Sequence, residues 1–366
     1  MGMLRPTWVE IDLAALRSNV ALVRERVGEN IQIFAVVKSN GFGCGAARVA
    51  ATVIDAGADA LAVGDPEDVR AIRAAGNAAP ILLYASTPPA AAAEVAGLGA
   101  IVTLHDMESV AAFAALDHPV EAYMKVEAGL GRLGIEADRW EAAFAAAKQS
   151  DSLRLTGIYT HLNAPEDRQS IKRQMARFQR ACEAGAAAGF HDLTRMVASS
   201  HIVLGYPELD CDAVNPGRGL FGLVEGDWAE MAPMRPVIAA VRSRIIQVKE
   251  FPAGDIVGFL GPAPLARPTR LAVLPIGFGD GLNHRAPLGE VLIAGARAPV
   301  VGRRGIEHTV VDVTLIPAAR TGDEAVLLGR QGSGEITAAE LCDWLGLPQM
   351  ELLPRLARTL PRVYLD

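Results

Sequence analysis

Two patterns of apolar residues divide the chain near residue 230. In the first part, short β-branched runs alternate with alanine-rich stretches of helical apolar spacing, such as PEDVRAIRAAG and RWEAAFAAAKQ. The expected strands occupy residues 31–38, 60–64, 81–85, 100–105, 121–127, 155–162, 195–200 and 213–222. About eight strand–helix units in roughly 200 residues are typical of a (β/α)₈ barrel of the TIM type, although a doubly wound sheet fits the same pattern.

Beyond this point, strand-like runs separated by Gly, Pro and Asp turns predominate, at residues 239–251, 270–277, 289–302, 309–316 and 323–329. One helix is expected at ITAAELCDWLG, with Thr337 as its N-cap and Glu340 three residues later. We therefore predict an α/β protein with an N-terminal barrel in residues 1–229 and a mostly-β C-terminal domain in residues 230–366.

Composition limits the possible partners. The 366 residues are 51% hydrophobic, which is enough for a core in both parts, and the net charge of −7 argues against nucleic acid or an anionic membrane surface as partner. The sequence has neither a long uncharged apolar run nor a start typical of export, so we expect a cytoplasmic protein. The cysteines stand singly, which predicts reduced thiols and no metal site, at Cys44, Cys182, Cys211 and Cys342.

Lys38 ends the first predicted strand and is followed by glycines in the segment AVVKSNGFGCG. A lysine that is desolvated at a strand end has a lowered pKa, so its neutral amine can form a Schiff base with a carbonyl group. The glycines would let the backbone approach a ligand closely. The alternative is a lysine that simply reaches solvent, and the short motif alone does not exclude it.

Further polar positions follow other predicted strands, at the end of the barrel where TIM barrels build their sites. They are Arg132, His161, Ser200 and the segment from Asn215 to Gly217. Taken singly, Arg132 suits a surface ion pair, His161 a core histidine and Ser200 a helix N-cap. Those separate explanations do not account for their convergence on one rim, and we predict a site there.

A series of segments resembles the ordered landmark segments of the alanine racemase family: WVEIDLAALRSN, AVVKSNGFGCG, KVEAGLGRLG, GIYTHLNAPED, NPGRGLFG, LAVLPIGFGDG, PVVGRRGIEHTVVDV and LPRVYLD. The resemblance extends from Trp8 to Asp366. It implies a fold-type III pyridoxal 5′-phosphate enzyme with an N-terminal barrel and a β-rich second domain. It also implies a head-to-tail homodimer, in which the partner's second domain completes each active site.

The resemblance assigns roles to the rim residues. Lys38 becomes the Schiff-base lysine and one of two catalytic bases. Arg132 would hydrogen-bond the cofactor's phenolic oxygen and border the substrate, with Lys125 holding the arginine, in some relatives as a carbamate. His161 would lie against the pyridine ring. The phosphate would be bound by Ser200 and by the amides of Gly217 and Arg218.

Several positions depart from the family's usual residues. Tyrosines are replaced at Phe42, Phe259, Phe278 and Met350. Phe259 stands where the second catalytic base should be, and a phenyl ring can neither donate nor accept a proton. Phe42 and Met350 replace tyrosines that reach the phosphate, so each loss should weaken cofactor binding by about 1 kcal/mol.

Asn215 replaces the arginine that normally hydrogen-bonds the pyridine nitrogen and keeps it unprotonated. A neutral amide can donate or accept, so the electronics of the ring would differ. Alternation along the predicted strand would place Arg218 on the opposite face from Asn215. Ile306 and Glu307 stand where a methionine–aspartate pair commonly borders the substrate carboxylate, and with Phe278 they complete the predicted substrate site.

Three functions remain open at this point. The first is a racemase that interconverts L-alanine and D-alanine, with His308, His284 or Glu307 as a substitute second base. The second is a one-base pyridoxal phosphate enzyme of the same fold, such as a decarboxylase, an aldolase or an eliminating lyase on an amino acid. The third is a non-catalytic homologue that binds the cofactor. We prefer the racemase, because the resemblance covers nearly the whole chain and no residue indicates a replacement reaction.

Overall fold

The structure, a computed structural model, describes residues 4–85, 87–224, 226, 228, 232–258, 263–284 and 289–366. The chain forms two compact units. The barrel unit contains Leu16–Gly41 and Gly45–Arg235, and the second unit contains Met1–Ala15, Phe42–Cys44 and Pro236–Asp366. The predicted boundary at residue 229 had assigned both short segments of the second unit to the barrel.

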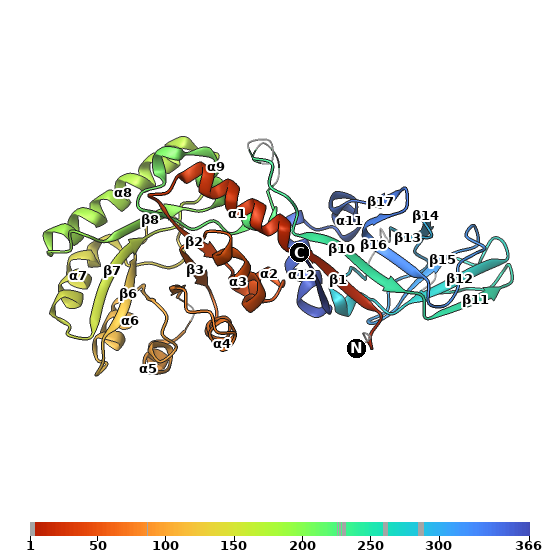
Figure 1. The fold of residues 1–366 in the computed structure, drawn as a ribbon, viewed down its shortest axis with the longest axis horizontal. Coiled ribbons are helices and arrows are strands. Elements are labelled where there is room, and N and C mark those ends of the chain that lie inside the picture. Colours follow the sequence, from red (N-terminus) through yellow and green to blue (C-terminus); the bar gives the residue numbers. More distant parts are fainter. Residues whose placement is uncertain are drawn as a thin grey trace. The chain divides into compact units, whose positions relative to one another are not determined.

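Eight parallel strands form the barrel (Figure 1). In sheet order they are β4 (Ile81–Leu83), β3 (Ala60–Val63), β2 (Gln32–Val36), β9 (Ala213–Val214), β8 (Thr194–Ala198), β7 (Leu153–Tyr159), β6 (Val120–Lys125) and β5 (Val102–Leu104). Leu82 bridges Ile101 in parallel, and two backbone hydrogen bonds of 2.8 Å join the outermost strands there. The sheet therefore closes, which confirms the (β/α)₈ barrel and excludes the doubly wound alternative.

Helices lie around these strands (Figure 1), and several begin at side-chain caps. They are α1 (Leu13–Val27), α2 (Lys38–Phe42), α3 (Ala46–Asp55), α4 (Pro66–Ala74), α5 (Ala92–Ala96), α6 (Met107–Ala114), α7 (Trp140–Gln149), α8 (Arg168–Ala187) and α9 (Ser200–Gly205). Asp65 accepts the N–H of Glu67 at 2.9 Å before α4, and Asp106 forms a capping box with Ser109 at α6. Polar caps thus fix where the chain turns from strand to helix.

Side chains from seven of the strands, together with Ile101 just before β5, fill the barrel interior, which is a packed core. They are Phe34, Val36, Ala60, Ala62, Leu82, Ile101, Tyr123, Tyr159, Met196 and Ala213. Large and small residues alternate: a Cβ on Gly157 would lie 2.4 Å from the ring of Tyr123, so only glycine fits beside that ring. Because the interior is filled, a site has to lie at the rim.

All eight barrel strands end before the predicted residue, by one to eight residues, and two of these ends lead directly into the candidate site. β2 ends at Val36, before Lys38, and β9 has two residues where residues 213–222 were predicted. Past β9, Gly217 has φ −125° and ψ −85°, and a 3₁₀ helix (Arg218–Phe221) follows. The prediction that strand alternation places Arg218 opposite Asn215 was therefore wrong, because no strand connects them.

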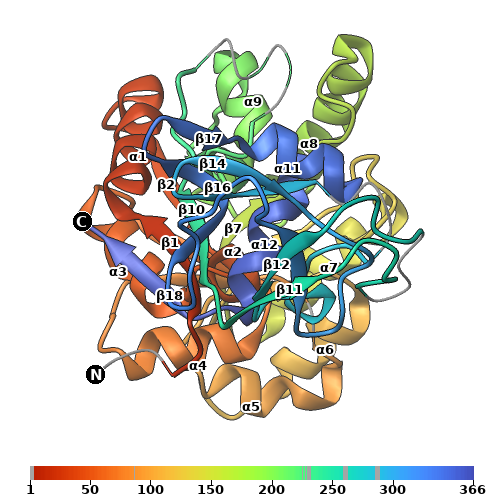
Figure 2. The ribbon, with the colours of Figure 1, turned by 90° about the vertical axis from the view of Figure 1, so that its right-hand side faces the viewer.

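The second unit is mostly β, as predicted, and its described residues form two sheets and two α-helices. The larger sheet has the order β14 (Ala296–Pro299), β13 (Glu290–Ile293), β16 (Glu324–Gln331), β10 (Ile238–Arg244), β1 (Thr7–Asp12), β18 (Arg362–Leu365), with β17 (Gly334–Ile336) beside β16. The smaller sheet contains β11 (Gln247–Phe251), β12 (Thr269–Leu274) and β15 (Thr309–Asp312). β1 is antiparallel to β10 and parallel to β18 (Figure 2). The sequence pattern had predicted neither β1 nor β18.

The two helices of this unit are α11 (Ala338–Leu345) and α12 (Gln349–Thr359). The capping box predicted for α11 is confirmed: the N–H of Glu340 donates to Thr337 Oγ1 at 3.2 Å, and the N–H of Thr337 donates to Glu340 Oε2 at 3.0 Å. α12 had not been predicted.

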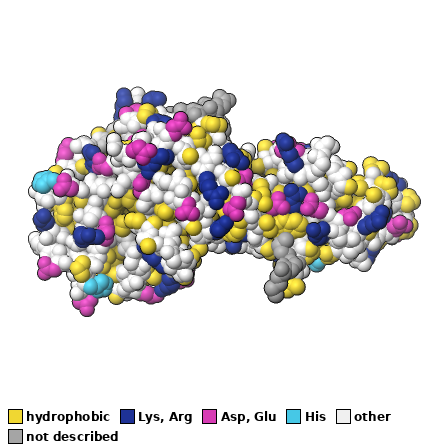
Figure 3. Space-filling view, in the orientation of Figure 1, with side chains coloured by type: hydrophobic (Ala, Val, Ile, Leu, Met, Phe, Trp, Pro, Cys, Tyr) yellow, Lys and Arg dark blue, Asp and Glu magenta, His cyan; other side chains and the backbone are white. Residues whose placement is uncertain are grey.

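Acidic and basic side chains are interspersed over the face of the barrel unit drawn in Figure 3. Within the part of the chain that the structure describes, no helix combines the length and the apolar character needed to cross a membrane.

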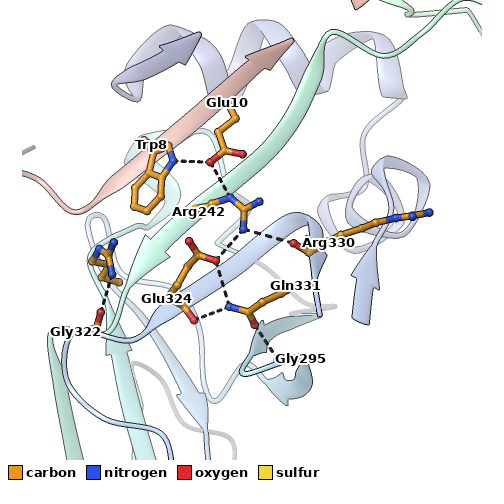
Figure 4. A network of polar contacts seen from close by, with 9 residues as sticks. Trp8, Glu10, Arg242, Gly295, Gly322, Glu324, Arg330 and Gln331 are labelled. Carbon is orange, nitrogen blue, oxygen red and sulfur yellow. Dashed lines mark hydrogen bonds and ion pairs between the residues drawn. The ribbon is translucent and has the colours of Figure 1, made fainter. Parts of the chain in front are cut away.

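A part-buried ion-pair network joins three strands of the larger sheet (Figure 4). Arg242 on β10 donates from Nε to Glu10 on β1 and from Nη1 to Glu324 on β16, both at 2.8 Å. Trp8 Nε1 also donates to Glu10, at 3.0 Å, and Gln331 Nε2 donates to the Glu324 carbonyl oxygen at 3.0 Å. The Arg242 guanidinium thus links β1, near the N-terminus, to a sheet whose other strands all come from residue 238 onward.

Replacing Arg242 should therefore destabilise the second unit. Arg242→Met leaves two carboxylates close together without their cation, which should cost about 1.5–3 kcal/mol and lower the Tm by roughly 5 °C. Circular dichroism on heating measures this. Arg330→Met is the matched control, because the Arg330 side chain is 77% exposed and its ion pair with Glu335 should contribute little. Equal losses for the two variants would contradict the role given to Arg242.

Candidate active site

Polar side chains predicted from the sequence meet at the carboxyl end of the barrel. Lys38 follows β2. His161 follows β7, which lies three places from β2 in the sheet order. Burial, and then the positive charges of Lys125, Arg132, Lys38 and Arg218, lower the pKa of His161 to about 4. These side chains are therefore close enough to form one electrostatic cluster, which we call the cationic rim: Lys38, Lys125, Arg132, His161 and Arg218.

Lys38 begins a left-handed turn. Ser39 and Asn40 have φ of 57° and 56°, a region that favours glycine, so the turn needs support. The carboxylate of Asp68 accepts the N–H of Asn40 at 3.0 Å, and Asn40 Oδ1 accepts the N–H of Ala46 at 2.8 Å. These bonds fix the direction in which the Lys38 side chain leaves the strand.

The Lys38 amine forms no hydrogen bond with the residues that the structure describes. Loss of water around the amine, and then the positive charges of Arg132 and Arg218, lower the pKa of Lys38, although the side chain as a whole remains accessible from solvent. A lysine in this state has a larger neutral fraction than a free surface lysine, and its amine is a nucleophile.

Glu127 organises the loop that carries Arg132. Its carboxylate accepts backbone N–H groups from Gly129 and from Gly131, the latter at 3.0 Å. Burial opposes the charge on Glu127, but these bonds outweigh burial and lower its pKa. Since the carboxylate is engaged by its own loop, the exposed Arg132 guanidinium has no ion pair among the described residues, so a surface ion pair does not explain its position.

Lys125, at the end of β6, is buried, and its Nζ lies 4.6 Å from the centre of the Tyr159 ring. Burial, and then the charge of Arg132, lower the pKa of Lys125 to about 8, against a smaller opposing effect of Glu127. A positive Lys125 repels Arg132. The role predicted for it, to hold the arginine, requires a change of its charge.

Ser200 joins the ends of β8 and β9. Its buried Oγ accepts the N–H groups of Gly217 at 2.9 Å and Gly219 at 3.0 Å, and so its hydroxyl hydrogen is left to donate to an anion. Ser199, not Ser200, is the N-cap of α9. The Gly217 amide, predicted as a phosphate donor, binds Ser200 in this conformation.

Arg218 lies between the two residues whose N–H groups bind this serine, and it adds a positive charge to this part of the rim. Its Nη2 lies 2.8 Å from Nδ1 of His201, and the His201 ring packs edge-on against Trp228 with centroids 5.0 Å apart. The guanidinium is thereby held near Lys38 and His161, whose pKa values it lowers.

Asn215 is buried beneath the rim and touches a residue that the sequence analysis did not select. Its Nδ2 donates to the hydroxyl of Tyr84 at 3.2 Å, and its Oδ1 has no partner among the described residues. Tyr84 directly follows β4, so the strand-end rule that selected Lys38 and Asn215 would also have selected Tyr84. We had considered tyrosines only at the family's usual positions.

The remaining predicted residues lie in the second unit. The 3₁₀ turn of Phe278 is joined to Ile306 through the N–H of Gly279, at 2.8 Å, and the Phe278 ring packs edge-on against His284 at 5.2 Å. Phe278 and Met350 are each 39% exposed and Ile306 is 61% exposed, while Phe42 is buried. Glu307 is exposed beside Ile306. Phe259 lies outside the described residues.

The cationic rim can bind anions. Its cations exceed the carboxylates available to them, since Glu127 and Asp68 are engaged by backbone N–H groups. Beside the cations stand a free amine and a serine hydroxyl. Such a set suits a carbonyl compound that carries a phosphate, with which the amine can condense.

The sequence matches two families, described as "Alanine racemase, N-terminal domain" over residues 11–225 and "Alanine racemase, C-terminal domain" over residues 238–364. Among its relatives is the alanine racemase of Syntrophobacter fumaroxidans, which is 34% identical over 363 residues, or 96% of each chain. The alanine racemase of Symbiobacterium thermophilum is 33% identical, and the match covers 99% of this chain and 97% of that relative.

Solved structures agree with this assignment. The alanine racemase of Streptomyces lavendulae superposes with a TM-score of 0.88 at 30% identity, over 100% of this chain and 98% of the other. That of Bacillus anthracis, solved with bound L-Ala-P, has a TM-score of 0.91 at 26% identity, over 100% of this chain and 96% of the other. The chain belongs to the alanine racemase family.

Proposed function

We propose that this protein is a pyridoxal phosphate-dependent racemase that interconverts L-alanine and D-alanine. The observation that carries the proposal is the free Lys38 amine, with its lowered pKa, inside the cationic rim of the barrel. The relatives are named alanine racemases, and this indicates both the reaction and the amino acid. The carboxylate of a small amino acid suits the surplus of positive charge at the rim.

The residues present fit pyridoxal phosphate. Lys38 would hold its aldehyde carbon, Arg132 its phenolic oxygen, and Ser200 with Arg218 its phosphate. The buried Asn215 Oδ1 lacks a partner among the described residues, as expected for an atom that a bound molecule satisfies. When bound, the cofactor withdraws electrons from the amino acid and so acidifies its Cα–H bond.

Lys38 Nζ would then take or return the Cα proton on one face, which the neutral amine favoured by its surroundings can do. His161, neutral at physiological pH, would pack against the cofactor without adding another cation. The lowered pKa of Lys125 also suits carbamate formation, in which its neutral amine adds CO₂ and releases a proton. The resulting anion would attract Arg132 where the ammonium repels it.

The second unit would complete the site of a partner subunit in a homodimer. Apolar side chains stand at predicted substrate positions (Phe278 and Ile306) and at a predicted cofactor position (Met350), and each is at least 39% exposed in one chain. A large contiguous patch of exposed apolar side chains commonly marks an interface with another chain.

One observation favours a second candidate, a one-base enzyme of the same fold. Phe259 has no proton to give, so the second face of Cα needs another group. His284, packed against Phe278 in the second unit, is the substitute that we favour for racemisation.

Attachment of the cofactor to Lys38 is the first test. The protein with pyridoxal phosphate should absorb near the visible edge, and borohydride should fix the cofactor to the peptide that contains Lys38. Lys38→Gln should lose both signals, while Lys148→Gln, at an exposed lysine, should keep them. Label on another lysine, or no colour in the unaltered protein, would remove the central assignment.

The reaction itself is tested with L-alanine in deuterated water and chiral analysis. A general acid–base group contributes about 10²–10⁴ in rate, so Phe259→Tyr should raise racemisation about tenfold or more, and Phe259→Leu should not. Cα deuteration without inversion in the unaltered protein would favour the one-base enzyme. Rapid inversion by the unaltered protein would contradict the role given to Phe259 and would turn the search to His284→Gln.

The neutral state of His161 predicts how stability depends on pH. Its folded pKa of about 4 is below the unfolded value of about 6.5. Below that unfolded value only the unfolded chain gains the proton, so stability falls as the pH drops from about 6.5 towards 4. In ligand-free protein, His161→Gln should remove about 1–2 kcal/mol of the loss between pH 7 and pH 5, measured by urea unfolding. The exposed His191→Gln is the control, and an equal effect of both variants would refute the assignment.

A further inference from the structure

The Asn215 amide has one partner and one open position. It is 5% exposed, its Nδ2 donates to the Tyr84 hydroxyl, and its Oδ1 has no partner among the described residues. The opposite orientation would give the oxygen to Tyr84 and leave both N–H groups of a buried amide without a partner. An amide has two such donors, and buried unpaired donors are costly, so the observed orientation is the better one.

Tyr84 is itself fixed by the barrel core. Its ring lies against Tyr159, with centroids 5.9 Å apart, and the Tyr159 hydroxyl lies 3.0 Å from Thr103 Oγ1. Thr103 in turn donates to the carbonyl oxygen of Leu83, at 2.8 Å. Burial raises the pKa of Tyr84, which therefore remains a neutral phenol able to accept the N–H of Asn215. A rigid aromatic pair thus sets the direction of the amide.

The strand order places Asn215 between the two ends of the rim that would hold the cofactor. β9 lies between β2 and β8, the N–H of Val36 donates to the Pro216 carbonyl oxygen at 2.9 Å, and Ser200 binds Gly217. A molecule held by Lys38 at one end and Ser200 at the other would turn an edge toward the end of β9, which carries Asn215. Pyridoxal phosphate has one polar ring atom besides its aldehyde, phenolic oxygen and phosphate, which is the ring nitrogen.

We propose that Tyr84 is a positioning residue, which holds the Asn215 amide with its oxygen toward the cofactor so that the ring nitrogen is bound in its protonated form. This inference rests on the proposed function. It names the chemical form that the site selects: a pyridinium ring, whose N–H donates to Asn215 Oδ1.

Because the rim carries several positive charges, the protonation of the ring nitrogen depends on this one acceptor. Lys38, Lys125, Arg132 and Arg218 all oppose a further positive charge. The carboxylates of Glu127 and Asp68 are engaged by backbone N–H groups, and His161 is neutral. The phosphate and the substrate carboxylate offset part of the repulsion. Without a correctly turned amide oxygen, the cations would favour the unprotonated nitrogen.

The test is ¹⁵N NMR of the holoenzyme reconstituted with pyridoxal phosphate labelled at the ring nitrogen. At neutral pH the unaltered protein should give a pyridinium-type signal. Tyr84→Phe removes one oxygen and lets the amide turn, so the signal should move toward the unprotonated position. Asn215→Asp keeps an acceptor whichever way it turns and should keep the pyridinium signal, even combined with Tyr84→Phe. Tyr159→Phe is the matched control and should leave the signal unchanged.

An unprotonated nitrogen in the unaltered protein overturns the proposal, as does a pyridinium signal that Tyr84→Phe leaves unmoved. Equal shifts from Tyr84→Phe and Tyr159→Phe would show a general effect of the aromatic pair, which also overturns it. Failure of the unaltered protein to bind the labelled cofactor would instead overturn the proposed function, so the two failures are distinguishable. Circular dichroism of each variant verifies that it is folded.

Discussion

Mutual repulsion among the cations at the carboxyl end of the barrel is the interaction on which the rest of the site depends. Parallel strands deliver Lys38, Lys125 and Arg132 to one rim, and Arg218 joins them from the loop after β9. Burial, and then the neighbouring positive charges, lower the pKa of His161 to about 4 and lower that of Lys38. The unliganded protein thus holds an unfavourable concentration of charge, and an anionic ligand gains affinity by relieving it.

That repulsion persists because the nearby carboxylates are used to shape the backbone. Asp68 accepts the N–H of Asn40 and supports the left-handed turn after Lys38, and Glu127 accepts N–H groups of the loop that leads to Arg132. Each carboxylate fixes the position of a cation through the main chain without forming an ion pair with it. The site therefore gains defined geometry and keeps its positive charge for a ligand.

Much of the fold was predictable, because parallel barrel strands are buried on both faces and appear as continuous apolar runs between helical stretches. The strand-end rule also gave the rim residues. β9 was predicted too long, because its two residues are defined by pairing with β2 and β8 and not by a pattern of their own. β1 was not predicted, because it pairs with β10, which is distant in sequence. Thr7 of β1, for example, lies opposite Ser243 of β10. The contact of Tyr84 with Asn215 likewise follows from closure of the barrel.

The phenols of this chain stand at other positions than the resemblance to the family implies. Phenylalanine or methionine stands at the four positions where the resemblance implies tyrosine, yet Tyr84 and Tyr159 lie beneath the rim. The barrel unit thus supplies phenols near the predicted cofactor, and the positions where the resemblance implies tyrosine do not. An acceptor at the ring nitrogen would not reach the Cα proton, but it would set the ring's charge. Control of the reaction would then lie more in the electronics of the cofactor, through Asn215, than in a second phenolic acid.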